Sequence, residues 1–351
     1  MCSLPSTPTI KPHENAGTDS TTHHLLLILS QKDEIKFFNG KALDTLLPAS
    51  VSFSVVNEQD YSRLREILRE QRPDIILGGW STPPLPDLDN RPPAPYYCHI
   101  CGAVRKQVPR AYMEQGMKVT NWGTAISKTV AEAALLLGLA CFRNLGKHQV
   151  DFHLNKKWRG VTANPKSFLG IQAGIHGFGN IGQELALLLK ALGANVVTYD
   201  PYVNSAKVAS MGVENEPSLT GLFQRCDIVF ECCGLTPETV HIVDAKLLAV
   251  MKDDATFVNV GRGNLVDEAA LIAEVSSGRL RAGLDVFSEE PVPEDSPLRG
   301  LPGLVAMPHL GGIAQESFIR AVQTAMENIH RYVNEQELQY EVSLAEYDRM
   351  T

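Results

Sequence analysis

The sequence predicts an α/β protein built on doubly wound parallel sheets, and three observations support this fold class. Between residues 24 and 124, short apolar runs of strand length alternate with stretches of helical periodicity. The alternation returns between residues 171 and 307, with apolar runs again separated by helical stretches. A long apolar helix over 129–143 separates the two series. Strands joined by helical crossovers form mostly parallel sheets covered on both faces, so two such lobes are expected.

Composition narrows the class of protein. The chain has 351 residues, 44% of them hydrophobic and 21% charged, which is ordinary for a globular protein of about two domains. The net charge of −8 argues against a nucleic-acid partner, because a phosphate-binding surface needs a basic patch. Apolar runs stay below the roughly 18 residues of a membrane span, and the N-terminus lacks a secretory pattern. We therefore expect a cytoplasmic protein without a nucleic-acid or membrane partner.

The first lobe follows a segment that has no hydrophobic periodicity. Residues 1–22 are rich in Ser, Thr and Pro, which predicts a disordered tail. His23 and His24 come next, and we expect both to be solvated rather than to act as ligands. The folded part then begins with a buried-strand run at 25–29. Further strands are expected at 51–56, 75–77, 96–100 and 119–121, and helices at 61–70 and 109–115.

The second lobe begins with the helix over 129–143, which is apolar on nearly all sides and is therefore expected to be buried. Its strands are expected at 171–175, 196–199, 227–231, 255–260, 282–286 and 305–307. Its helices are expected at 205–211, 218–225, 245–251 and 268–276. A last helix over 316–334 is expected to pack back against the first lobe, which makes that lobe discontinuous in sequence.

A glycine-rich turn lies at the start of the second lobe. Gly177, Gly179 and Gly182 have G-x-G-x-x-G spacing between an apolar strand and a helical stretch, which is the context that dinucleotide binding requires. The first glycine permits the tight turn, the second lets the backbone approach a pyrophosphate, and the third lets the helix pack closely on the strand. Asp200 closes the next strand, where a carboxylate accepts hydrogen bonds from ribose hydroxyls and repels a 2′-phosphate. The pattern predicts NAD rather than NADP.

The cysteines give no framework for disulfides or metal. The chain has seven, and the C-x-x-C pair of Cys98 and Cys101 has no second pair at zinc spacing. We expect this pair to be buried thiols near a strand end. Cys226, Cys232 and Cys233 flank an apolar run and are expected in the core. No metal site is expected.

Three later strand ends carry polar side chains that fit catalysis. Arg262 follows an apolar strand, where a guanidinium can pair bidentately with a carboxylate. His309 and the neighbouring carboxylates Glu289 and Glu290 fit an acid/base pair. Taken alone, Arg262 is more often a surface ion-pair residue, the two glutamates also fit solvated loop charges, and His309 also fits a satisfied loop histidine. Their joint placement after three apolar runs, all downstream of the glycine turn, favours a site.

Four stretches resemble the D-isomer-specific 2-hydroxyacid dehydrogenase family, which is NAD-dependent: GFGNIG, NVGRGNLVDEAAL, GLDVFSEEP and PHLGG. Their order and approximate spacing match, and the resemblance covers nearly everything after the tail. It implies two Rossmann-like lobes, with the nucleotide lobe inserted into a flavodoxin-like substrate lobe. The implied domains are 23–124 plus 315–351 for the substrate (catalytic) domain and 125–314 for the NAD-binding domain.

The resemblance also implies roles. Arg262 would bind the substrate carboxylate and polarise the adjacent carbonyl, and His309 would protonate the carbonyl oxygen. Glu290, directly before the proline, rather than Glu289, would pair with His309. Asp285 matches the position that contacts the nicotinamide carboxamide. The implied cofactor contacts are Gly177, Phe178, Gly179, Asn180, Ile181, Gly182, Asp200, Thr236, Val260, Gly261 and Asp285.

In the first lobe, the stretch 100–104 resembles the loop whose main-chain N–H groups hold the substrate carboxylate. The implied substrate-binding residues there are Gly102, Ala103 and Val104, together with Arg262. The family pattern has a second glycine and an aspartate, whereas this chain continues with Arg105 and Lys106. These cations either recognise a second anionic group or face solvent.

The expected activity is hydride transfer between NAD(H) and a small 2-hydroxy or 2-keto acid with D-stereospecificity. Hydroxypyruvate or glyoxylate is the expected substrate type; 3-phosphoglycerate is less expected because the chain stops soon after its last helix. A homodimer through the nucleotide lobe is expected, with 129–143 as part of its surface. The alternative is an NAD(H)-sensing, corepressor-like binding protein of the same fold. His176, directly before the first glycine, is expected to have no catalytic role.

Overall fold

The computed structural model describes residues 23–158 and 165–350. The expected tail at 1–22 lies outside the described residues. The chain folds into two compact units. Among the described residues, unit 1 comprises 23–123 and 318–348, and unit 2 comprises 124–317 and the last residues from Arg349.

Unit 1 is built on a five-stranded parallel sheet with the strand order β2-β1-β3-β4-β5. This order is the flavodoxin-like arrangement of a doubly wound sheet, which confirms the predicted fold class. The strands are β1 (His23–Ile28), β2 (Val51–Val56), β3 (Ile75–Gly78), β4 (Tyr96–His99) and β5 (Lys118–Thr120).

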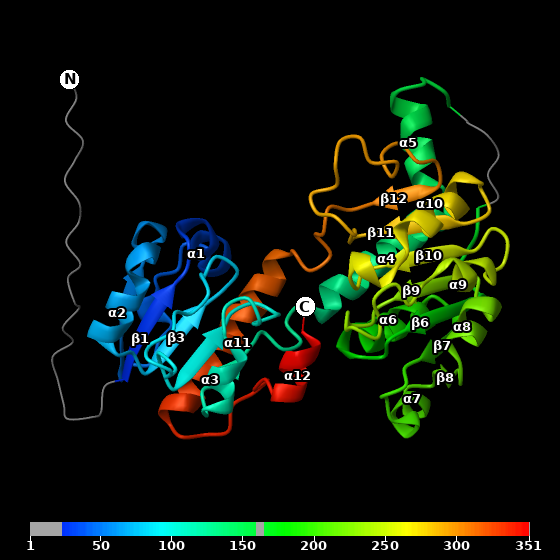
Figure 1. Ribbon diagram of the computed structural model, residues 1–351. Coiled ribbons are helices and arrows are strands. Elements are labelled where there is room, and N and C mark those ends of the chain that lie inside the picture. Colours follow the sequence, from blue (N-terminus) through cyan, green and yellow to red (C-terminus); the bar gives the residue numbers. More distant parts are fainter. Residues whose placement is uncertain (1–22, 159–164, 351) are drawn as a thin grey trace, which may run out of the picture. The chain divides into compact units, whose positions relative to one another are not determined.

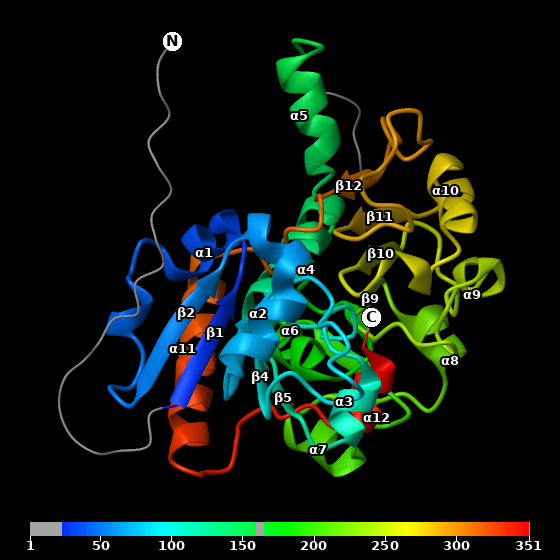
Figure 2. The same cartoon turned by 60° about the vertical axis from the view of Figure 1, so that its left-hand side comes forward.

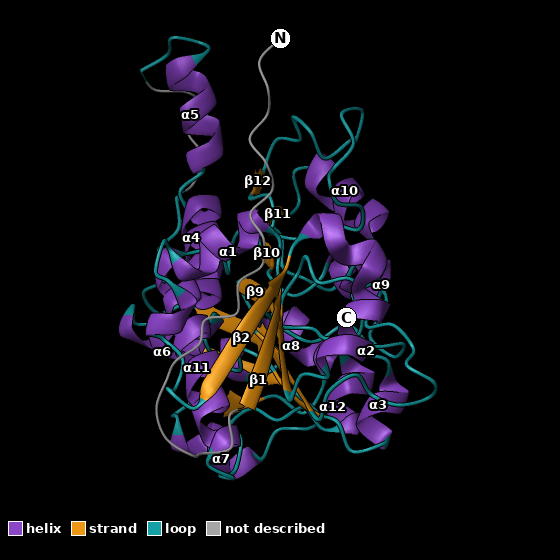
Figure 3. Ribbon diagram, turned by 90° about the vertical axis from the view of Figure 1, so that its left-hand side faces the viewer, coloured by secondary structure: helices purple, strands orange, loops and turns teal. Residues whose placement is uncertain are grey.

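Helices cover both faces of this sheet. They are α1 (Gln31–Phe38), α2 (Leu64–Gln71), α3 (Arg110–Glu114), α11 (Gln315–Val333) and α12 (Leu344–Arg349), with short 3-10 turns at Leu43–Thr45 and Glu58–Arg63. Figure 3 shows α1 and α11 on one side of β1 and β2, with α2 and α3 on the other. The rings of Phe37 in α1 and Phe318 in α11 pack edge to face, with their centroids 5.0 Å apart. This contact joins the two helices over the same face of the sheet.

Unit 1 differs from the sequence expectations at several points, and the short helix α12 is one element that was not expected. Helix α1 was not expected; the hydroxyl of Ser30 accepts from Asp33 N at 3.1 Å and caps it. The helix expected at 61–70 begins only at Leu64, because the preceding residues form the 3-10 turn. His24 is not simply solvated: it lies in β1, with its Nε2 3.2 Å from the side chain of Gln71.

Unit 2 is built on a seven-stranded parallel sheet with the order β12-β11-β10-β9-β6-β7-β8. In sequence order within the unit this is 3-2-1-4-5-6 with one further strand, the doubly wound order of dinucleotide-binding sheets. Six strands were expected; the edge strand β8 is additional, and its two polar, exposed residues give no apolar run. The strands are β6 (Gln172–His176), β7 (Asn195–Tyr199), β8 (Glu214–Asn215), β9 (Ile228–Glu231), β10 (Thr256–Asn259), β11 (Arg281–Leu284) and β12 (Leu304–Ala306).

Two hydrophobic clusters lie on opposite faces of this sheet. One joins α4 and α6 to the strands through residues such as Leu137, Leu185 and Phe230. The other joins α8, α9 and α10 to the sheet, and these helices lie together on one side in Figure 1. The helices of the unit are α4 (Ser127–Phe142), α5 (Leu145–His153), α6 (Asn180–Ala191), α7 (Ser205–Ser210), α8 (Leu219–Arg225), α9 (Ala245–Ala249) and α10 (Glu268–Ser276).

The apolar helix α4 is largely buried, as expected, and Gly138 lets it approach the sheet. A Cβ there would lie 3.0 Å from Ile228 and Phe230. Helix α5, which was not expected, continues the chain and extends away from the sheet of unit 2 (Figure 2). In the described part of the chain, no single helix is both long and apolar enough to cross a membrane. Only α4 and α5 together meet that length, and they are bent by 64°.

Candidate active site

The glycine turn connects β6 to α6 at the carboxyl edge of the unit 2 sheet. Gly177 has a φ of +89°, and a Cβ there would lie 2.7 Å from the main chain of Cys233. A Cβ at Gly182 would collide with the carbonyl oxygen of Gly177. Only glycine satisfies both positions, because the first needs a left-handed backbone and the second needs the helix pressed onto the turn.

Gly179 leaves room for a ligand at the start of α6. It is the N-cap of the helix, and no described heavy atom lies within 4 Å of where its Cβ would be. Since glycine has no side-chain oxygen, it does not cap the N–H groups of the first turn, to which Asn180 and Ile181 belong. These N–H groups and the helix dipole suit a pyrophosphate.

Asp200 follows β7 beside this turn. Its Oδ2 accepts from Phe178 N at 2.8 Å and its Oδ1 accepts from Tyr202 N at 2.9 Å. These two bonds hold the carboxylate at the strand end, where its remaining lone pairs can accept from ribose hydroxyls. The open cradle at Gly179 and the held carboxylate together fit a dinucleotide.

The turn that carries Arg262 follows β10. Asn259 shapes it: its Oδ1 accepts from Gly261 N at 3.0 Å and its Nδ2 donates to Arg262 O at 2.9 Å. Val260 N donates to Glu231 O at 3.2 Å. Asn259 had no role among the sequence expectations; the available sequence signal was an asparagine at the end of an apolar run, two residues before the first glycine of a G-x-G turn.

The residue after Arg262 must also be glycine. A Cβ at Gly263 would collide with the carbonyl group of Phe287. This close approach packs the Arg262 turn against the loop that carries Glu290. Burial lowers the pKa of Arg262, and the Glu290 carboxylate acts in the opposite direction. Since a guanidinium stays protonated in proteins, Arg262 is a partly desolvated cation facing an anion.

His309 and Glu290 form a direct contact. His309 Nδ1 lies 2.6 Å from Glu290 Oε2, and Glu290 Oε1 accepts from Phe287 N at 2.9 Å. The structure thus places Glu290, rather than Glu289, against the ring. His309 has a φ of +54°, and its N donates to Asp285 O at 2.8 Å. Hydrogen bonds to the main chain thus hold the Glu290 carboxylate and the backbone of His309, which fixes the geometry of the pair.

Asp285 is 3% exposed and holds the loop after His309. Its Oδ1 accepts from Leu310 N at 2.8 Å and its Oδ2 from Gly311 N at 2.9 Å. A Cβ at Gly311 would lie 2.7 Å from the same carboxylate. The sequence assigned Asp285 a contact with the cofactor; the structure adds that it fixes the histidine loop.

The predicted cofactor residue Thr236 and the predicted substrate residues of unit 1 lie on other loops. Thr236 is in the loop after β9, where its N donates to Thr239 Oγ1 at 2.6 Å. Gly102, Ala103 and Val104 follow β4 in unit 1, and Val104 is fully buried, so its side chain packs inside that unit.

The start of the unit 1 loop is tied to the sheet. Ile100 N donates to Gly78 O at 2.8 Å, so this N–H serves the sheet. Asn121 Nδ2 donates to Gly102 O at 3.1 Å. Arg105 and Lys106 are exposed. Cys98 is buried as expected, and burial raises the pKa of its thiol to about 11.

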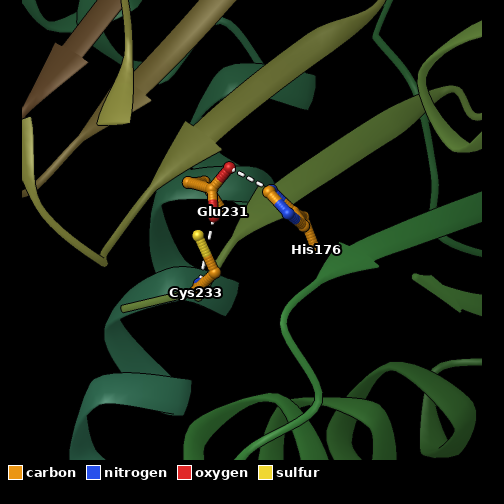
Figure 4. A group of neighbouring side chains, drawn as sticks. All are labelled: His176, Glu231 and Cys233. Atoms are coloured by element: carbon orange, nitrogen blue, oxygen red, sulfur yellow. Dashed lines mark hydrogen bonds and ion pairs between the residues drawn. The ribbon is translucent and has the colours of Figure 1, made fainter. Parts of the chain in front are cut away.

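Beneath the glycine turn, the expectation for the cysteines needs correction and His176 is found to have a partner. Cys226 is buried as expected, but Cys232 and Cys233 are only half-buried and pack against the edges of the two hydrophobic clusters. His176, which had no assigned partner, lies with its Nδ1 2.6 Å from Glu231 Oε2 (Figure 4). Burial lowers the pKa of His176, but Glu231, with Asp200 further away, raises it above its ordinary value overall. No local pattern in the sequence predicts this pair, because its members lie 55 residues apart.

Comparison with known proteins places this fold and site in a family. The sequence model described as D-isomer specific 2-hydroxyacid dehydrogenase, NAD binding domain, matches residues 135–311, which lie within unit 2. A hydroxypyruvate reductase of Thermotoga maritima is 37% identical over 221 residues, 62% of this chain and 71% of that protein.

A D-3-phosphoglycerate dehydrogenase of Methanocaldococcus jannaschii is 36% identical over 226 residues, 63% of this chain and 42% of that protein. The match therefore spans less than half the length of this relative. A D-isomer-specific 2-hydroxyacid dehydrogenase of Lactobacillus delbrueckii ssp. bulgaricus, solved in its NAD-complexed form, shares the fold. Its TM-score is 0.77 at 18% identity, over 91% of this chain and 100% of that chain.

The fold and site define a dinucleotide-binding α/β protein with a histidine–carboxylate pair at the edge of its nucleotide sheet. The chain belongs to the D-isomer-specific 2-hydroxyacid dehydrogenase family, and unit 2 contains the NAD-binding domain of that family.

Proposed function

We propose that the protein is an NAD-dependent D-2-hydroxyacid dehydrogenase acting on a small 2-hydroxy or 2-keto acid of the hydroxypyruvate or glyoxylate type. The observation that carries this proposal is the 2.6 Å contact between His309 Nδ1 and Glu290 Oε2. It lies at the sheet edge where ligands of doubly wound folds bind, in the same unit as the glycine turn.

The side chains divide the chemistry between them. Arg262 binds the substrate carboxylate through its planar fork and polarises the neighbouring carbonyl. Glu290 accepts from Nδ1–H of His309, which leaves Nε2–H to protonate the carbonyl oxygen. NADH, when bound, would supply the hydride. In the oxidative direction, His309 takes the hydroxyl proton back.

The cofactor is held by the groups around the glycine turn. The N–H groups at the start of α6 would hold the pyrophosphate, and Asp200 would accept from the adenosine ribose. Thr236, Val260, Gly261 and Asp285 complete the cofactor contacts. For the substrate, we assign Gly102, Ala103 and Val104 of unit 1 to its carboxylate through main-chain N–H groups.

The test is NADH oxidation, followed by absorbance, with a panel of hydroxypyruvate, glyoxylate, pyruvate and 3-phosphohydroxypyruvate. We expect the highest kcat/KM with hydroxypyruvate or glyoxylate. H309A should lower turnover by roughly two to four decades while NADH affinity is retained. NADH binding without turnover of any keto acid would contradict the enzyme and favour an NAD(H)-sensing protein.

We further assign the protein a homodimeric state, with α4 and α5 as part of the contact surface. Helix α5 and the residues after it expose several large apolar side chains that a monomer would leave in water: Leu145, Val150, Phe152, Leu154 and Trp158. Sedimentation should give a dimer for the native chain and a monomer for F152E. A native monomer would contradict this assignment.

A further inference from the structure

A buried polar cluster lies beneath the glycine turn and is not used by the proposed reaction. His176 and Glu231 end the neighbouring strands β6 and β9 and are direct partners in the parallel register. Side chains at paired positions of adjacent strands point to the same face of a sheet. The side chain two residues further along a strand points to that face as well. Cys233 is that residue, and in Figure 4 its main-chain N contacts the same carboxylate as His176, with its side chain beside that carboxylate.

The three side chains present one nitrogen, one oxygen and one sulfur ligand atom. Nδ1 of His176, a carboxylate oxygen of Glu231 and Sγ of Cys233 all lie within 4.8 Å of one another. Ligands of a zinc ion at about 2.0–2.3 Å lie roughly 3–4 Å apart, so small side-chain rotations bring this set to coordination distance. Imidazole, carboxylate and thiolate together are the ligand types of a zinc site, with a fourth position open.

The ligands are held before any ion binds. Glu231 is fully buried and its Oε1 accepts from Cys233 N at 3.0 Å. The main chain of Cys233 packs against two glycines: a Cβ at Gly177 would lie 2.7 Å from its N, and one at Gly261 2.9 Å from its carbonyl oxygen. Cys233 is half-buried, whereas His176 and Glu231 are buried, so Cys233 is the member of the cluster nearest to solvent.

The charge balance also fits a divalent cation. With the imidazole protonated, the imidazolium, the carboxylate and the neutral thiol carry no net charge. A divalent ion that displaces one proton from the imidazole and one from the thiol again leaves a neutral cluster. The other groups facing it are Asp200, the Cys232 thiol and the Tyr199 ring, which lies 5.9 Å from His176. A neutral complex avoids the cost of burying a net charge.

We propose that His176, Glu231 and Cys233 form a binding site for a thiophilic divalent cation of the zinc and cadmium class. A buried ion pair between β6 and β9 does not require the thiol. Its contribution to stability is also small, since replacing such a pair by apolar residues is often neutral or stabilising. An ion pair between His176 and Glu231 does not explain why the thiol of Cys233 lies within 4.8 Å of both groups.

The experiment is a cadmium titration of the full chain after treatment with a chelator, followed through the ultraviolet charge-transfer band of a cadmium thiolate. One equivalent should give the band, and zinc should displace it. C233S should abolish this band, and H176N should weaken the affinity by roughly a hundredfold or more. C232S removes the adjacent thiol and serves as the matched control, so it should titrate like the native chain.

C233S keeps both members of the buried ion pair, so it tests the site even where H176N or E231Q lowers stability. Circular dichroism checks the fold of each variant. No band at one equivalent, an unchanged band in C233S, or a band lost equally in C232S would overturn the proposal. The readout is absorbance rather than turnover, so it is independent of the proposed reaction.

Discussion

His309 Nδ1 lies 2.6 Å from Glu290 Oε2, and the other oxygen of that carboxylate accepts from Phe287 N at 2.9 Å. The carboxylate is therefore fixed at both oxygens, once by the ring and once by the main chain. This arrangement assigns the Nδ1 proton of the ring to the bond with Glu290 and leaves Nε2 for the substrate. Several consequences of this geometry and of its surroundings are measurable.

E290Q replaces the carboxylate by an amide of the same size. The amide oxygen still accepts a hydrogen bond but no longer offers a negative charge to a ring that carries a proton. We expect kcat to fall by roughly ten- to a hundredfold, while the KM for the keto acid and the Kd for NADH change little. E289Q, one residue away, is the matched control and should keep its activity. A native kcat in E290Q would contradict the positioning role.

R262A removes the cation that we propose to bind the substrate carboxylate. Because a charged, bidentate hydrogen bond is lost, kcat/KM for the keto acid should fall by roughly a hundredfold or more. R262K restores the charge without the planar fork and should recover only part of the loss. Steady-state kinetics with saturating NADH measure both variants. Equal kcat/KM in R262A and the native chain would refute the assignment.

D200A removes the carboxylate that follows β7. If Asp200 holds the adenosine ribose as proposed, the ribose loses a charged acceptor and a 2′-phosphate is no longer repelled. The preference for NADH over NADPH should narrow by roughly ten- to a hundredfold. Fluorescence titrations with both cofactors measure this ratio. Asp200 also accepts from Phe178 N, so thermal unfolding is needed to check that the turn survives. An unaltered ratio in a folded variant would place cofactor selection elsewhere.

D285N tests the loop after His309. An amide has one oxygen, so it cannot accept from Leu310 N and Gly311 N through two separate oxygens as the carboxylate does. The loop should shift, kcat should fall by roughly tenfold or more, and stability should decrease by about 1–3 kcal/mol. D244N is the matched control, because it makes the same substitution at an aspartate that also accepts from the main chain. Asp244 caps α9 by accepting from Leu247 N at 2.8 Å.

NADH affinity separates two roles of Asp285. If this residue chiefly orders the histidine loop, the Kd for NADH stays close to the native value in D285N while kcat falls. A large loss of NADH affinity with native kcat would instead favour its contact with the nicotinamide and contradict the loop role.

His99 in unit 1 predicts a pH dependence of stability. Burial lowers the pKa of this histidine from 6.5 to about 3. Between these values the unfolded chain binds a proton that the folded chain does not, so the free energy of unfolding falls as the pH drops below 6.5. This contribution is complete above pH 6.5 and is lost progressively toward pH 3, at up to about 1.4 kcal/mol per pH unit.

Urea unfolding at pH 7.5 and 5.5 measures this slope. H99Q should reduce the loss of stability between these two pH values. H148Q alters an exposed histidine of α5 and should retain the native slope. Equal slopes in H99Q and the native chain would contradict the assignment.

Local patterns account for most of the fold and for the separate parts of the site. Apolar runs predict nearly all strands, because each strand must bury a short continuous segment. The G-x-G-x-x-G spacing predicts the turn and Asp200, because neighbouring residues in the chain shape both. Elements without such a signal were missed: α1 is short and charged, and β8 has two polar residues at a sheet edge.

The sequence alone establishes the family, the cofactor class and the candidates Arg262, Glu290 and His309. Only the tertiary structure decides which groups meet. It selects Glu290 over Glu289 for His309, ties Asp285 to Leu310 and Gly311, and brings His176 to Glu231 across 55 residues. The physical reason is that strand register pairs residues distant in sequence. Such a contact becomes visible only once two strands lie side by side.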